Sequence, residues 1–319
     1  MVISLIKKHL SLYFTTSVLV TITVLVTVSA KAEILFEGYS KVVSGGVHVG
    51  FIVSRYEFDS KKKQFSFTYL MKTNELAGNM LESIKGVSKA DLSPVAYAYT
   101  SLAGGQTKTI DAKFEGGKFI ATVKDGANIS KINKALPKGV FLSYFLVYEM
   151  LKNPKGITPG TKYEYQAIAE EDGAIVRGMA FVKGVEEFNG IKAYKILNDF
   201  KDTKFTSYVS EKGEVLSAKS PVQSISTELV AQSSAATGNF QVPTALLKSL
   251  FGEVPLGNKN ELANKGAVSS MKSLQIEAPS KPVVTQPPSV EAPEKTKVAP
   301  MDPVEAPAST NKPEPIENK

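Results

Sequence analysis

Apolar and aromatic side chains recur at every second position in several parts of the chain between residues 33 and 251. The alternation is clearest in four stripes, which are Phe65, Phe67, Tyr69 and Met71; Tyr97 and Tyr99; Phe119, Ala121 and Val123; and Tyr163 and Tyr165. A period of two with aromatic and β-branched residues is typical of strands that have one buried face. The pattern therefore predicts a mainly β protein.

Turn sequences separate these stripes. Most of them contain a glycine preceded by Gly, Asp, Asn or Lys, at Ser44-Gly45-Gly46, Gly104-Gly105, Gly116-Gly117, Asp125-Gly126, Asp172-Gly173, Asn189-Gly190 and Lys212-Gly213. Asn-Gly between two apolar runs is the strongest short signal for a hairpin. We therefore expect a hairpin at Asn189-Gly190, between strands at 185–188 and 191–197.

Three segments depart from the alternation and predict helices. Residues 74–85 carry Leu76, Met80, Leu81 and Ile84 at helical spacing. Residues 140–151 are almost entirely apolar and lie between Pro137 and Pro154, which predicts a buried helix of about three turns. A short helix is expected at 244–250, after Pro243.

An apolar helix must be covered, and the concave face of a curved sheet can cover it. Strand runs at a spacing of about 8–12 residues are typical of barrels and sandwiches. We therefore expect a highly curved antiparallel sheet of about nine to eleven strands, an open or half barrel, with one buried apolar helix and two short helices.

Composition changes sharply near residue 279. Of the 17 prolines, ten lie in the last 41 residues, among Glu, Lys, Ala, Val and Thr and without aromatics. Such a segment cannot bury enough apolar surface to offset its ordering entropy. We expect a curved β domain at 33–251, a loosely ordered lead-in at 252–278 and a disordered Pro/Glu/Lys-rich tail at 279–319. The tail is either an inert spacer or an arm that reaches an envelope protein or cell-wall partner.

The first 32 residues have the pattern of a secretory signal. Lys7 and Lys8 precede an apolar run, and Ala30-Lys31-Ala32 is a small-residue cleavage site. We expect cleavage before Glu33 and a periplasmic or otherwise exported protein. The run is long, so the alternative is an inner-membrane anchor formed by residues 10–28.

The charge balance argues against nucleic acid as a partner. The chain carries +7, and removal of residues 1–32 with their three lysines leaves +4. Residues 279–319 hold five lysines and six acids, so residues 33–278 carry about +5, almost all of it from lysine. Arg55 and Arg177 are the only arginines, whereas nucleic-acid sites rely on arginine forks.

Few side chains suit catalysis or metal binding. There is no cysteine, and His48 is the only histidine after residue 32. A histidine acts as a catalytic base only beside a positioned nucleophile and an orienting group, and no sequence motif indicates either for His48. The Ser-x-x-Lys sequences that begin at Ser60 and Ser269 are expected by chance in a chain rich in serine and lysine. The acidic groups 170–172 and 186–187 are interpreted as turn or surface charge. We expect no enzyme, no cofactor and no metal site.

The second half of the domain resembles a known family. The run Thr158-Pro159-Gly160-Thr161-Lys162-Tyr163 is followed by Gly184-Val185-Glu186-Glu187-Phe188, by Gly190-Ile191-Lys192-Ala193-Tyr194 and by Tyr208-Val209-Ser210-Glu211-Lys212-Gly213. This order is similar to that in exported bacterial proteins of domain of unknown function 3108, mainly over residues 158–230. The resemblance implies an envelope protein with a curved antiparallel sheet, related in shape to lipoprotein-carrier half barrels. It brings no catalytic residues.

The aromatic stripes are the candidate binding surface. If they line an open concave face, they suit a lipid or acyl ligand, since large apolar pockets with few polar groups hold such molecules. The predicted ligand-binding residues are Phe65, Phe67, Tyr69, Met71, Tyr97, Tyr99, Tyr163 and Tyr165. The expected function is that of an exported, non-catalytic envelope protein that binds an apolar ligand or a protein partner. The alternatives are a scaffold whose concavity is filled by residues 140–151, and an envelope hydrolase.

Overall fold

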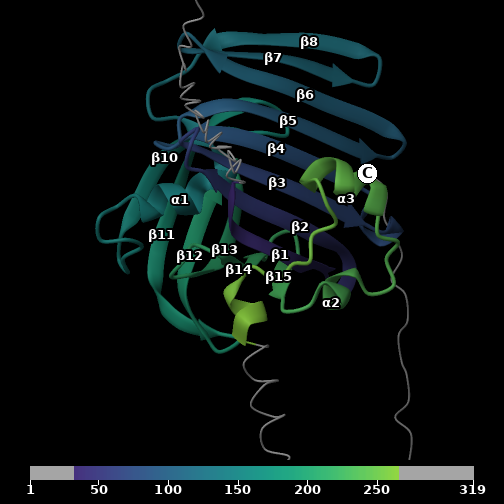
Figure 1. The fold of residues 1–319 in the computed structure, drawn as a ribbon, viewed down its shortest axis with the longest axis vertical. Helices are drawn as coiled ribbons and strands as arrows, with labels where there is room; N and C mark the ends of the chain where they lie inside the picture. Colours follow the sequence, from purple (N-terminus) through teal and green to yellow (C-terminus); the bar gives the residue numbers. More distant parts are fainter. Residues whose placement is uncertain (1–31, 266–319) are drawn as a thin grey trace, which may run out of the picture. The chain divides into compact units, whose positions relative to one another are not determined.

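The computed structural model describes residues 32–265, so the expected signal and the proline-rich tail lie outside the described residues. One sheet of 15 strands dominates this part of the chain (Figure 1). The first eight strands are β1 Glu33–Ser44, β2 Val47–Asp59, β3 Gln64–Thr73, β4 Leu81–Lys89, β5 Pro94–Ala103, β6 Gln106–Glu115, β7 Lys118–Asp125 and β8 Asn128–Ala135. The remaining seven are β9 Phe141–Leu142, β10 Lys162–Ala169, β11 Ala174–Phe188, β12 Ile191–Phe200, β13 Thr203–Ser210, β14 Val215–Ser220 and β15 Ile225–Val230.

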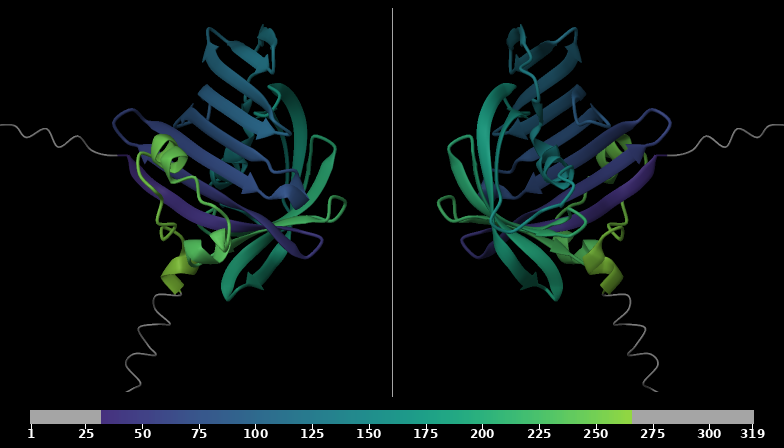
Figure 2. Two further views of the ribbon diagram at one scale, coloured as in Figure 1. Left: turned by 90° about the vertical axis from the view of Figure 1, so that its right-hand side faces the viewer. Right: turned by 90° about the vertical axis from the view of Figure 1, so that its left-hand side faces the viewer.

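The sheet is two meanders joined at their ends. Strands β1 to β8 follow one another in sequence order, as do β9 to β15, and β1 pairs with β15 to join them. Every pair is antiparallel except the two-residue pairing of β9 with β10. The sheet curls so that the β3–β7 wall and the β10–β13 wall face each other without closing (Figure 2). The predicted curved, open antiparallel sheet is confirmed, with more strands than the nine to eleven expected.

The helices are short. They are the 3₁₀ turns η1 Glu75–Ala77 and η2 Ser143–Phe145 and the α-helices α1 Leu146–Leu151, α2 Ser233–Thr237 and α3 Thr244–Phe251. The helix expected at 244–250 is confirmed as α3. The helix expected at 140–151 begins later, because Phe141 and Leu142 pair with β10 as β9.

The helix predicted at 74–85 is wrong. Only Glu75–Ala77 forms a turn, which Gly78 ends with a φ of 83°, and Leu76 is 77% exposed. Residues from Leu81 onward form β4, which pairs with β3 on one side and β5 on the other. Two complete rows of backbone hydrogen bonds outweigh a helical spacing of only four apolar residues.

The hairpin expected at Asn189-Gly190 is confirmed. Strand β11 ends at Phe188 and β12 begins at Ile191, and these two residues pair with each other. Asn189 and Gly190 have φ angles of 50° and 73°, as a two-residue turn that matches the twist of the strands requires.

The outer face of β1–β3 is covered by the end of the domain. Tyr39, Phe51, Val53 and Leu70 point outward and pack against Leu247 and Phe251 of α3. Residues 253–260 then run along β1, and we call them the strap. These strands are thus apolar on both faces, which explains the unbroken apolar run at 49–53.

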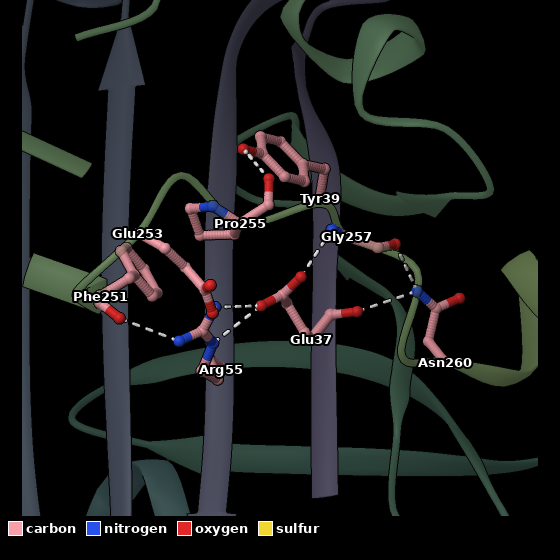
Figure 3. A network of polar contacts seen from close by, with 8 residues as sticks. All are labelled: Glu37, Tyr39, Arg55, Phe251, Glu253, Pro255, Gly257 and Asn260. Carbon is pink, nitrogen blue, oxygen red and sulfur yellow. Dashed lines mark hydrogen bonds and ion pairs between the residues drawn. The ribbon is translucent and has the colours of Figure 1, made fainter. Parts of the chain in front are cut away.

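A buried ion pair fastens the strap to the sheet (Figure 3). Arg55 of β2 donates to the Glu37 carboxylate, with Nε 2.7 Å from Oε2, and to the Phe251 carbonyl at 2.9 Å. The other Glu37 oxygen accepts from the backbone N–H of Gly257 at 2.7 Å. Asn260 donates to the Glu37 carbonyl at 3.0 Å. Arg55 and Glu37 are each 3% exposed, so these contacts lie out of water.

Gly50 permits close approach of two strands. A Cβ on Gly50 of β2 would lie 2.3 Å from the Lys72 carbonyl oxygen of β3, which cannot move without disturbing the sheet. We expect Gly50→Ala to lower the free energy of unfolding by about 1–3 kcal/mol. Urea unfolding measures this change. Gly184→Ala in β11 is the matched control: no heavy atom lies within 4 Å of its Cβ position, so it should change stability by less than about 0.5 kcal/mol. Equal losses in the two variants would contradict the prediction.

Candidate functional site

Residues 141–151 enter the concavity of the sheet and fill part of it. Tyr144 stacks on Phe67, with ring centroids 4.7 Å apart and planes at 9°. Phe145 is completely buried and meets Phe67 edge to face at 5.2 Å. The Tyr56 hydroxyl donates to the Tyr144 carbonyl at 2.9 Å. The aromatic stripes of β2 and β3 are therefore in large part the core around this segment.

A cavity of about 430 Å³ remains beside the segment. It lies between the inner face of β1–β3, the helix α1 and the inner face of β12–β15. Its apolar lining comes from Phe36, Ile52, Tyr56, Tyr69, Tyr144, Leu146, Val147, Tyr148, Met150, Ile196, Phe205, Val215 and Ala218. This volume is within the range of about 300–1,000 Å³ that is usual for small-molecule sites.

The polar groups in the cavity are few and almost all uncharged. Ser54 and Ser143 lie on its walls, and Asn198 donates to the Ser207 hydroxyl at 3.0 Å. Burial is the largest cause of the raised pKa values of Tyr56, Tyr69 and Tyr144, so these hydroxyls stay neutral. Glu214 is the single Asp or Glu among the lining residues of the described chain.

Glu170 lies behind Ser143 and is completely buried. The Ser143 hydroxyl donates to its Oε2 at 2.6 Å, while Oε1 has no hydrogen-bond partner within residues 32–265. Burial raises the pKa of Glu170 to about 8, partly offset by the Ser143 hydroxyl and the Tyr144 backbone N–H. The interpretation of residues 170–172 as solvated turn charge is therefore wrong for Glu170. The loop connecting β10 to β11 begins inside the sheet, and only Glu171 and Asp172 reach Lys201 near the surface.

The eight predicted ligand-binding residues are divided among four places. Tyr69 lines the cavity. Phe65, Phe67, Tyr97 and Tyr99 pack in the core around residues 140–145, and Met71 packs beside Ile52. Tyr163 and Tyr165 lie at a second, more open hollow of about 730 Å³, which also has charged residues such as Lys138, Glu149, Glu164, Arg177 and Asp199. The binding role of these eight residues stays a prediction.

The smaller cavity is the better candidate site because apolar side chains enclose it, whereas charged side chains line the second hollow. Of the residues that line the smaller cavity, only Tyr69 was predicted from the sequence. Ile52, Ser54 and Tyr56 do alternate on β2, but Phe51, Val53 and Arg55 are buried on the other face. Burial on both faces hides the period of two. Asn198, Ser207 and Glu214 carry no motif, and only the curvature of the sheet brings them to the cavity.

Comparisons with known proteins give fold likenesses only. No family model matches the chain, and no curated protein matches it. One similar solved structure is a beta-barrel-like protein of domain of unknown function DUF1849 from Brucella abortus, with 10% identity over 63% of this chain and 98% of that chain and a TM-score of 0.43. Another is a DUF1089 family protein from Pseudomonas aeruginosa, with 13% identity over 54% and 90% of the two chains and a TM-score of 0.32.

Other chemistry-bearing residues occupy structural positions. His48 in β2 has Nε2 2.9 Å from the Gly50 carbonyl, and its ring lies 5.0 Å from that of Phe240. Glu186 pairs with Lys195 at 2.9 Å on the surface. Across residues 32–265, no group of three or more potential ligands could hold a metal ion. In the same part of the chain, no helix is both long and apolar enough to span a membrane.

Proposed function

We propose that this protein is an exported, non-catalytic envelope protein that binds an apolar, lipid-like ligand in the cavity between α1 and the curved sheet. The observation that carries the proposal is the cavity of about 430 Å³, with aromatic and aliphatic walls and with Glu214 as the one acid in its described lining. Well-formed apolar cavities of this size are the usual sites for small apolar ligands. The signal-like residues 1–32 support export, and the resemblance to domain of unknown function 3108 supports a place in the envelope.

A binding role fits the cavity better than catalysis does. Ser143 lines the cavity and its hydroxyl donates to Glu170, but the only histidine in residues 32–265 contacts Phe240 and the Gly50 carbonyl instead. Ser143 also stands at the start of η2, so its bond to Glu170 has a structural task in fixing the segment that fills the concavity. The proline-rich residues 279–319 would serve as an arm toward an envelope protein or cell-wall partner.

Filling the cavity tests the proposal. Ser54 of β2 lines it, and we expect Ser54→Phe to weaken binding of the neutral fluorescent probe N-phenyl-1-naphthylamine by about tenfold or more, since the new ring occupies the ligand's volume. Ser130→Phe, the same change at an exposed position of β8, should bind like the wild type. Titration of probe fluorescence measures affinity, and circular dichroism confirms that both variants fold.

Two results would contradict the proposal. Equal affinity of the two variants for the probe would show that the probe does not bind in the cavity. Absence of probe binding by the wild type, together with native mass spectra that show bare polypeptide, would favour the scaffold alternative, in which residues 141–151 are simply the core.

A further inference from the structure

Glu214 is a buried acid at one end of the cavity. It stands between β13 and β14, where its backbone carbonyl accepts from the Ser210 N–H at 2.9 Å. The preceding Gly213 packs against α1, since a Cβ there would lie 2.7 Å from Leu151 Cδ1. Glu214 is 5% exposed and lines the cavity with its neighbours Gly213 and Val215. The fold thus holds a carboxyl group at the wall of an apolar chamber.

The carboxylate is only half satisfied by the protein. Its Oε2 accepts from the backbone N–H of Glu261 at 2.8 Å, and Oε1 has no donor among residues 32–265. Tyr148 is another residue that lines the cavity; burial is the main cause of the raised pKa of its hydroxyl, and the charge of Glu214 raises it further. Because Glu214 lines the cavity, a ligand there meets a carboxylate that has one hydrogen bond from this part of the chain.

No cation of the described chain compensates this charge inside the cavity. The lining contributed by residues 32–265 includes no lysine, arginine or histidine. Lys212 is near, but its side chain is 67% exposed and pairs with Glu261 at 3.2 Å. Arg55 lies on the opposite face of the sheet and is bound to Glu37. A buried carboxylate without a cation is costly unless a partner arrives with the opposite charge.

We infer that the cavity selects amphiphiles whose polar end is an ammonium or similar cation, with the cation at Glu214 and the apolar part along Tyr56, Tyr69 and Tyr144. This inference rests on the proposed function and specifies its ligand class. An anionic amphiphile such as a fatty acid would bring a second negative charge beside Glu214 with no cation to balance it. A neutral alcohol would find hydrogen-bonding groups but no charge partner.

Surface charge does not give the same preference. Residues 33–278 carry about +5, so non-specific attraction at the surface favours carboxylates over amines. A preference for the amine must therefore come from a local acidic site.

Three probes with the same chain separate these outcomes: dodecylamine, 1-dodecanol and dodecanoate, each used to displace N-phenyl-1-naphthylamine. For the wild type we expect the affinity for the amine to be higher than that for the alcohol by about tenfold or more, and dodecanoate to bind most weakly. Glu214→Gln keeps the size and the acceptor for the Glu261 N–H, and it should bring the amine to the affinity of the alcohol. Glu211→Gln, on the same turn but 55% exposed and paired with Lys192, should keep the wild-type order.

The results distinguish this inference from the proposed function. If the amine binds no better than the alcohol, or if Glu214→Gln leaves the order unchanged, the charge selectivity is overturned while the cavity remains a binding site. If the wild type binds neither the fluorescent probe nor any of the three amphiphiles, the proposed function itself fails, and the inference with it.

Discussion

Arg55→Ala is expected to lower the free energy of unfolding by about 3–5 kcal/mol, since removing one partner of a buried ion pair leaves the other charge uncompensated. Glu37 would remain in a site where it is 3% exposed, and the Phe251 carbonyl would lose its donor. Urea unfolding followed by circular dichroism measures the change. We also expect faster amide exchange in residues 253–260, because these contacts fasten the strap to β1 and β2 (Figure 3).

The other arginine is the matched control. Arg177 of β11 is exposed, so Arg177→Ala should change stability by less than about 0.5 kcal/mol. Arg55→Lys tests geometry at constant charge. A lysine ammonium cannot reproduce the planar fork that reaches Glu37, Glu253 and the Phe251 carbonyl together, so this variant should also be destabilised. A loss below about 1 kcal/mol for Arg55→Ala would show that the pair does not hold the strap.

The strap also shows a limit of what composition predicts. Residues 252–278 contain no aromatic side chain, and composition alone assigned them to a loose lead-in. In the structure, Gly257 and Asn260 reach Glu37 through a backbone N–H and a side-chain amide. These bonds join positions more than 200 residues apart. Sequence patterns report local periodicity and do not contain such pairings.

The fold was predictable where one face of a strand is buried. The stripe Phe65, Phe67, Tyr69 gave the right face for β3, and Asn189-Gly190 gave the right turn between β11 and β12. The prediction failed for β4, where Leu81 and Ile84 also fit a helical spacing. There the hydrogen bonds of β3 and β5 decide the outcome, and no local signal reports them.

The cavity was less predictable than the sheet. The aromatic stripes pointed to the correct side of the sheet, and Tyr69 does line the cavity. Phe67 and Tyr97 lie on the same side, but they pack in the core against residues 140–145 and do not line the cavity. Which aromatic residues face empty space depends on how far the segment 141–151 extends into the concavity, and that is set by the two-residue pairing of β9 with β10.

Glu170 gives the second large expected effect, a dependence of stability on pH. Its pKa in the folded protein is about 8, above the value of 4.5 for a free side chain. Between these values the folded state keeps a proton that the unfolded state has released. The free energy of unfolding therefore falls as pH rises through this window, by up to about 1.4 kcal/mol per pH unit. The stabilising protonated form is complete below about pH 4.5 and is lost above about pH 8.

Glu170→Gln should remove this slope. Glutamine is neutral at every pH and keeps an oxygen to accept from the Ser143 hydroxyl. Urea unfolding at pH 5, 6, 7 and 8 gives the difference in stability between variant and wild type, which we expect to shift in favour of the variant by several kcal/mol across the series. Any constant packing cost of the substitution cancels in that shift. Glu115→Gln, at an exposed position of β6, is the control and should run parallel to the wild type.

The pH series also tests how the segment that borders the cavity is held. If the Ser143–Glu170 bond fixes residues 141–151, ionisation of Glu170 at high pH should loosen this segment before the rest of the sheet, since a buried charge without a cation is costly. Amide exchange in residues 143–151 should then increase between pH 6 and pH 8.5 in the wild type, after correction for the intrinsic effect of pH, and should not increase in Glu170→Gln. Parallel stability curves for the two proteins from pH 5 to pH 8 would mean that Glu170 gains a compensating partner and stays ionised. The segment would then owe its position to the pairing of β9 with β10 and to its contacts with Phe67 and Tyr56.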